Sequence, residues 1–164
     1  MDRQIESIIE RLKLQPHPEG GWYAQTYRSA GSTPPMGTGK RVRPWSTSIY
    51  FLLTGENFSA FHRLKSDELW YHHAGDALAV EMIDAEGRYE RLEIGSVMEG
   101  YAPQAIVPGG CWFASHPLEG SQWALVGCGV APGFDFDDFE LAEADALAAE
   151  YPQHEDVIRR YTRA

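Results

Sequence analysis

Between Trp45 and Val130 the sequence alternates short apolar segments with turn signals, and no helical periodicity interrupts them. Turns of Gly, Asp, Asn and Pro separate segments rich in β-branched and aromatic residues. Many short strands at regular spacing are typical of an antiparallel sandwich or barrel. The expected strands, preceded by WYAQTYRS at 22–29, are TSIYFLL, SAFHRL, ELWYHH, ALAVEMI, RYERLEI, QAIVP, CWFAS and QWALVGCGV.

The two ends of the chain have helical patterns. Near the N-terminus, Ile5, Ile8, Ile9 and Leu12 fall at i, i+3, i+4 and i+7, which predicts a short helix with one apolar face. Near the C-terminus, helices are expected at about 141–150 and from about 153 onward. The length of 164 residues favours one domain, 1–164, with a barrel core at about 20–135.

Charge and hydropathy exclude several classes of partner. The formal net charge of −10 argues against nucleic acid, since phosphate binding requires basic patches. No apolar run is long enough to span a bilayer, and the charged N-terminus lacks a signal-peptide hydrophobic region, so we expect a cytoplasmic protein without a membrane partner. Cys111 and Cys128 form no CxxC pair and are expected to be buried thiols.

The segment AFHRLKSDELWYHHAGD, at 60–76, holds the candidate chemistry. Alternate side chains of a strand share a face, so Glu68, Trp70 and His72 lie on one side of their strand. If the strands before and after the Ser66–Asp67 turn pair with each other, His62 and Glu68 converge inside the barrel. A carboxylate buried there needs a hydrogen bond, an ion pair or a metal.

These residues resemble the two cupin motifs. His62, Glu68 and Gly75 match H-x-H-x3-E-x6-G, and PGGCWF at 108–113 matches P-x-G-x2-H. Leu64 and Phe113 stand where the motifs have their second and third histidines.

Longer segments extend the resemblance over nearly the whole chain. HPEGGWY, TSIYFLL, VPGGCWFAS, LVGCGVAPGFDFDDFELA and the closing YPQH are similar to the cupin-like family DUF985, also called cupin 5. The resemblance implies an all-β fold, a double-stranded β-helix or jelly-roll barrel, usually a homodimer with a pocket between its sheets. It also brings His17 and Glu19 towards the pocket rim. The fold resembles that of metal-free sugar-nucleotide epimerases and of metal-binding cupins.

A metal site is not favoured. A tight transition-metal site usually has three or four protein ligands, and only His62 and Glu68 remain at cupin ligand positions. A weakly bound divalent metal is the alternative, and His72 is then the third ligand. His73 faces inward only if a bulge shifts the strand register.

We therefore expect a small polar or carbohydrate-like metabolite in the barrel. In the first hypothesis the protein is a metal-independent epimerase or isomerase: His62 moves a proton, Glu68 orients the imidazole and Tyr50 is a proton partner. A non-catalytic metabolite-binding module and a metal-dependent oxygenase or isomerase are the alternatives. The further candidate ligand-binding residues are Trp70, His72, His73, Gln104, Trp112 and Phe113.

Overall fold

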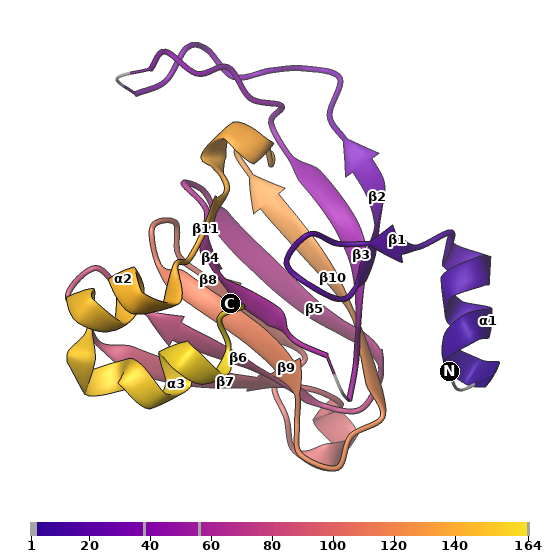
Figure 1. The fold of residues 1–164 in the computed structure, drawn as a ribbon. Helices are drawn as coiled ribbons and strands as arrows, with labels where there is room; N and C mark the ends of the chain where they lie inside the picture. The colour runs from indigo at the N-terminus through magenta and orange to yellow at the C-terminus, as the bar shows by residue number, and fades with distance from the viewer. Residues whose placement is uncertain (1–2, 38, 56, 164) are drawn as a thin grey trace.

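Two antiparallel β-sheets pack face to face, and helices lie at the two ends of the chain (Figure 1). The structure, a computed structural model, describes residues 3–37, 39–55 and 57–163. The first sheet has the spatial order β1 (Gln15–Pro16), β2 (Trp22–Arg28), β3 (Thr47–Thr54), β10 (Trp123–Ala131), β5 (Asp67–Gly75) and β8 (Gln104–Val107). The second has the order β11 (Glu140–Leu141), β4 (Ser59–Arg63), β9 (Trp112–Pro117), β6 (Leu78–Ile83) and β7 (Tyr89–Ile94).

The helical segments lie outside this pair of sheets. Helix α1 (Arg3–Leu12) precedes the first sheet, and α2 (Ala144–Glu150) and α3 (Glu155–Arg160) follow the last strand. The described residues also form the 3₁₀ turns η1 (Val97–Glu99), η2 (Phe136–Asp138) and η3 (Pro152–His154). The expected jelly-roll fold with a short N-terminal helix and C-terminal helices is confirmed.

The alternation of side chains along β3 divides the interior from the outer face. Phe51 and Leu53 belong to the core between the sheets, whereas Leu52 packs under α1 with Ile5. This matches a strand covered on both faces: the period of two sends alternate residues to the core and to the helix. The second sheet is covered in the same way, because Phe61 and Trp112 pack against the C-terminal helices.

Two local expectations were wrong. Strands β4 and β5 do not pair across the Ser66–Asp67 turn, because the chain crosses there from the second sheet to the first. The expected helix from 141 begins at Ala144, because Glu140 and Leu141 pair with Arg63 and His62 as β11. In both cases pairing with a strand that is distant in sequence decides the structure, which local sequence does not reveal.

Cys111 and Cys128 are free and buried, as expected. No helix in the described part of the chain is long and apolar enough to cross a membrane.

The last residue of β5 gives a test of the fold. Gly75 has φ of +82°, and a Cβ there would lie 2.5 Å from the backbone oxygen of Trp123 on the neighbouring strand. Gly75→Ala is expected to reduce the free energy of unfolding by about 2–3 kcal/mol, from the left-handed backbone and the clash together. Urea denaturation measures this value.

Gly100→Ala is the matched control, because Gly100 has φ of +89° with no atom within 4 Å of the added Cβ. Only the backbone cost of about 1 kcal/mol is expected for it. Equal losses in the two variants would contradict the close approach of β5 and β10.

Candidate functional site

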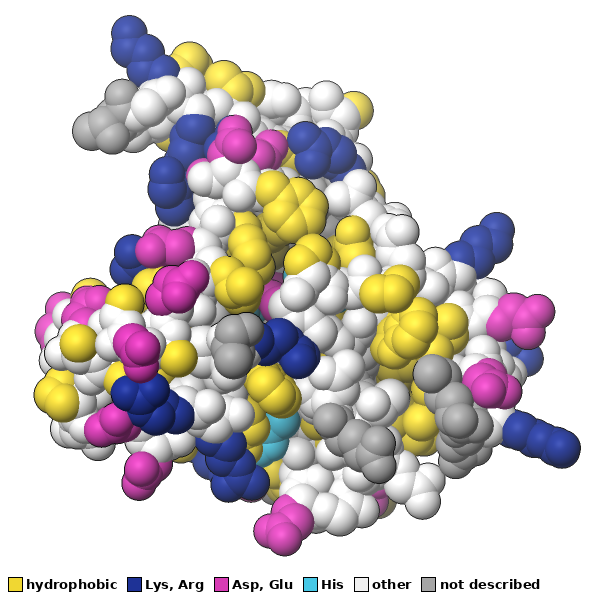
Figure 2. Space-filling model, in the orientation of Figure 1, with side chains coloured by type: hydrophobic (Ala, Val, Ile, Leu, Met, Phe, Trp, Pro, Cys, Tyr) yellow, Lys and Arg dark blue, Asp and Glu magenta, His cyan; other side chains and the backbone are white. Residues whose placement is uncertain are grey.

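A cavity of about 400 Å³ opens between the sheets, a size typical of small-molecule sites. In Figure 2 hydrophobic side chains surround a hollow near the middle of the visible face, in the region where η2 and the end of β10 lie in Figure 1. The cavity is lined by polar and apolar groups: Gln15, His17, Glu19, Tyr23, Gln25, Arg28, Thr47, Ile49, His62, Leu64, Glu68, Cys128, Val130, Phe134, Asp135, Phe136 and Phe139.

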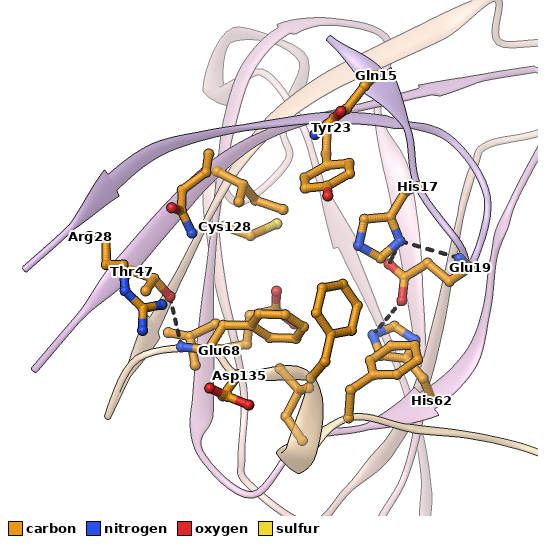
Figure 3. Close-up of a pocket in the computed structure, with 17 residues that line it drawn as sticks. Gln15, His17, Glu19, Tyr23, Arg28, Thr47, His62, Glu68, Cys128 and Asp135 are labelled. Carbon is orange, nitrogen blue, oxygen red and sulfur yellow. Dashed lines mark hydrogen bonds and ion pairs between the residues drawn. The ribbon is translucent and has the colours of Figure 1, made fainter. Parts of the chain in front are cut away.

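A buried pair, Glu19 and His62, forms one side of the cavity (Figure 3). His62 comes from β4, and Glu19 from the turn between β1 and β2. Glu19 Oε2 lies 3.1 Å from His62 Nε2, and His62 Nδ1 lies 2.7 Å from the carbonyl oxygen of Ala60. A carbonyl oxygen only accepts, so Nδ1 carries a proton and Nε2 faces the carboxyl group.

Burial decides where the remaining proton lies. Desolvation raises the pKa of Glu19 well above its usual value, and the charge of Glu68 raises it further. Desolvation also lowers the pKa of His62 to about 3, against the hydrogen bond to Ala60. In this pair the proton therefore lies on the Glu19 carboxyl group, which donates it in a hydrogen bond from Oε2 to Nε2 of the neutral His62 imidazole.

His17 lies on the other side of Glu19. Its Nδ1 accepts a hydrogen bond from the Glu19 backbone N–H at 3.2 Å and lies 3.6 Å from Glu19 Oε1. Burial lowers the pKa of His17 to about 4, so the ring is neutral at physiological pH. Tyr23 and Phe51 contact the imidazole edge-on, and these contacts fix its orientation.

Glu68 reaches the cavity from the opposite sheet, on β5. Desolvation raises its pKa to about 7, although the nearby Trp70 indole and Cys128 thiol favour the charged form. Among the described residues, Glu68 Oε2 and Trp70 Nε1 have no hydrogen-bond partner. A buried oxygen without a partner costs about 1–3 kcal/mol, which a ligand that hydrogen-bonds to it would recover.

The segment 134–139, which includes η2, supplies an aromatic wall. Phe134, Phe136 and Phe139 contact one another edge-on, and the Phe134 N–H donates to Thr47 Oγ1 at 2.8 Å. The buried carboxylate of Asp138 holds this segment in place.

Asp138 Oδ2 accepts hydrogen bonds from Arg41 Nη1 at 2.6 Å and from Arg43 Nε at 2.9 Å. The two arginines lower the pKa of Asp138, although burial opposes them. The long β2–β3 connection is therefore tied to one wall of the cavity.

Four of the predicted site residues come together: His17, Glu19, His62 and Glu68 all line the cavity. His17 and Glu19 lie in its buried interior rather than only at its rim. The predicted contact between His62 and Glu68 was wrong, because both ring nitrogens of His62 have other partners, Ala60 and Glu19. Glu19 is thus the carboxyl group that orients His62.

Tyr50, His72 and His73 do not line the cavity. Tyr50 lies on the outer face of the first sheet in the cluster under α1, so it is not placed to exchange a proton with His62. His73 contacts the Tyr50 ring there, at 5.8 Å between centroids. The register of β5 against β10 shifts beside these histidines, and His72 Nε2 lies 3.2 Å from the Asp76 carbonyl oxygen.

The remaining predicted residues serve the core or the surface. Phe113 packs on His62 with 4.1 Å between ring centroids, and Trp70 contacts Phe113 from the core, so both support the site without lining the cavity. Trp112 faces the other side of its sheet, beneath Arg63 and the C-terminal helices. Gln104 is exposed on the edge strand β8, away from the cavity.

The side chains do not fit the metal set of a typical cupin. Leu64 and Phe113 occupy two histidine positions, and His62, Glu68 and His72 do not converge on one point. No group of three or more His, Cys, Asp or Glu side chains is arranged to hold a metal ion within residues 3–37, 39–55 and 57–163.

Sequence reasoning missed the walls of the cavity. Tyr23, Gln25 and Arg28 come from β2, and Cys128 and Val130 from β10. For Tyr23, Gln25, Cys128 and Val130 the signal was strand alternation, which was usable once one inward residue of each strand was known. The aromatic wall 134–139 follows the last long strand and has no periodicity that would have identified it.

Glu68 makes stability depend on pH. Between pH 4.5 and about 7 the unfolded chain loses the Glu68 proton while the folded protein keeps it, so the free energy of unfolding falls as pH rises through this range. Glu68→Gln removes this cost. We expect the variant to gain up to about 3 kcal/mol over the wild type above pH 7, and little at pH 4. Thermal unfolding from pH 4 to 8 measures the difference, and a gain that does not change with pH would contradict the raised pKa.

Comparisons with known proteins agree with the fold. A crystal structure of a protein from Shewanella oneidensis is 43% identical, with a TM-score of 0.86 over 96% of each chain. A hypothetical protein from Leishmania major is 40% identical, with a TM-score of 0.88 over 97% of this chain and 98% of that one. Oxalate decarboxylase from Bacillus subtilis, at 15% identity and a TM-score of 0.56 over 89% of this chain and 36% of its own, shares the fold alone.

None of the curated proteins compared with this chain matches it. The family model described as Cupin superfamily (DUF985) matches residues 6–142, and the chain therefore belongs to this cupin family.

Proposed function

We propose that the protein binds a small polar organic molecule in the cavity and moves a proton on it, as a metal-independent isomerase or epimerase. One observation carries the proposal: two acid–base sites, the Glu19–His62 pair and Glu68, line one cavity, and His62 and Glu68 come from opposite sheets. A ligand between the sheets therefore has His62 on one side and Glu68 on the other.

The two groups suit opposite roles. Glu68, with a pKa of about 7, is ionised in a large fraction of molecules near neutral pH and can accept a proton from a carbon next to a carbonyl group. Burial favours a protonated Glu19 beside a neutral His62, so this pair can donate a proton to the ligand. Groups whose environments set their pKa values apart are typical of acid–base sites.

Deuterium uptake tests this proposal. The purified protein is incubated in D₂O with a panel of small aldoses, ketoses and keto acids, and the added mass is measured by mass spectrometry. At least one compound is expected to gain one deuterium and to form an isomer. The rate is expected to rise with pH through about 7, as Glu68 loses its proton.

Glu19→Gln, His62→Gln and Glu68→Gln are each expected to lower this rate by about 10²-fold or more. His72→Gln is the control, because His72 lies on β5 but outside the cavity. Uptake that survives His62→Gln and Glu68→Gln would refute the proposal. Binding without uptake would instead indicate a non-catalytic binding module.

We also propose a homodimer. Tyr27 and Trp45 are 55% and 56% exposed, and they lie on β2 and on the connection from β2 to β3, which projects from the barrel in Figure 1. Exposed aromatic groups are enriched at protein interfaces.

Tyr27→Ser together with Trp45→Ser is expected to convert the dimer to a monomer in sedimentation equilibrium. Met98→Ser is the control, because Met98 is 91% exposed and lies far along the chain on η1. A wild-type monomer at micromolar concentration would contradict this expectation.

A further inference from the structure

Arg28 lines the cavity because of an irregularity in β2. In a regular strand, the residues on the same face as Tyr23 would be 25 and 27. The register against β3 shifts between Gln25 and Tyr27: Gln25 pairs with Ile49 and Tyr27 with Ser48, so Thr26 is the extra residue. The shift turns Tyr27 to the outside and brings Arg28 to the cavity.

The Arg28 guanidinium has no ion pair or side-chain hydrogen bond among the described residues. None of the acidic residues that line the cavity, Glu19, Glu68 and Asp135, forms an ion pair with Arg28 in the described part of the chain. Asp135 Oδ1 instead accepts the Asp137 N–H at 2.9 Å. Arg28 thus keeps its planar set of N–H donors for a ligand.

The far side of the cavity contrasts with this cation. In Figure 3 Arg28 lies on one side of the open space, and His17, Glu19 and His62 lie on the other. His17 and His62 are neutral at physiological pH, because burial lowers their pKa values to about 4 and about 3, and burial favours the protonated form of Glu19. The cavity therefore has a cation on one side and the Glu19–His62 pair on the other, and its walls include Ile49, Phe134 and the partly ionised Glu68.

We propose that the ligand is a small organic oxyanion, whose carboxylate or phosphate group binds to Arg28 and whose reacting carbon lies toward Glu19 and His62. Guanidinium forms paired hydrogen bonds with both kinds of oxyanion. This inference names the ligand class for the proposed function, and it rests on that function for the place of the reacting carbon only. Arg28 is a specificity-determining residue in this reading.

Matched probes test the charge of the ligand. Binding of galacturonate and glucuronate is compared by calorimetry with binding of galactose and glucose, which have the same ring without the carboxylate. Glucose 6-phosphate and inorganic phosphate are measured in the same way, as the probes that have a phosphate group in place of the carboxylate. At least one anionic sugar is expected to bind tenfold or more tightly than its neutral counterpart, and the arm that binds identifies carboxylate or phosphate as the preferred group.

Variants assign the preference to Arg28. Arg28→Gln is expected to lower affinity for the anionic sugar tenfold or more and to leave affinity for the neutral sugar unchanged. Arg28→Lys is expected to recover only part of the loss, because an ammonium lacks the planar pair of donors. Arg11→Gln, which makes the same charge change on exposed α1, is the control and is expected to leave both affinities unchanged.

The inference is overturned if no anionic probe binds, if neutral and anionic sugars bind equally, or if Arg28→Gln retains the preference. These results are separable from those that test the proposed function. Anion binding through Arg28 without deuterium uptake refutes the isomerase and leaves this inference standing. Deuterium uptake on a neutral sugar at a rate that Arg28→Gln does not change supports the isomerase and refutes the inference about Arg28.

Discussion

The hydrogen bond from His62 Nδ1 to the Ala60 carbonyl sets the chemistry of the cavity. Because it commits one ring nitrogen to donating, the other must meet Glu19 as an acceptor or as part of an ion pair. Burial makes the ion pair costly, so the shared proton stays on the carboxyl side. The turn that connects β1 with β2 also places Glu19 against His62. Arg163 Nε, near the end of the chain, donates to the Glu19 carbonyl oxygen and anchors the same turn.

The apolar side chains of Leu64 and Phe113 contribute to the raised pKa values of the carboxyl groups in the cavity. Leu64 lines the cavity, and the Phe113 ring covers His62, so apolar groups surround the titrating ones. In such surroundings a carboxyl group favours its neutral form. Glu68, beside Trp70 and Cys128, keeps a pKa near neutrality, and the pKa of Glu19 is raised by burial and then by the like charge of Glu68. The same apolar surroundings thus raise the pKa values of two carboxyl groups.

The sequence predicted the elements of the fold well, because each strand had its own apolar pattern and its own turn signals. It also predicted His62 and Glu68 as inward residues, since each occupies a motif position on a strand with clear alternation. What it misjudged was the partner of each strand. A short Ser–Asp turn reads as a hairpin, yet β4 pairs with β9 and β5 with β10. Pairing between residues about 50 positions apart depends on how the sheets close, and local propensity has no bearing on that.

The errors in the predicted site residues also arise because local sequence does not reveal strand pairing. Some of these errors were avoidable. With Phe113 inward, alternation alone requires its neighbour Trp112 to face the opposite side, which is where it lies. With Phe51 in the core, Tyr50 must face α1. Arg28 could not be found in this way, because a register shift at Thr26 reverses the alternation. No residue type in this strand indicates that shift. A residue that lines the cavity only through such an irregularity depends on its strand neighbours for its position. The presence of a cation at the cavity therefore depends on how β2 and β3 pair as well as on the residue type at position 28.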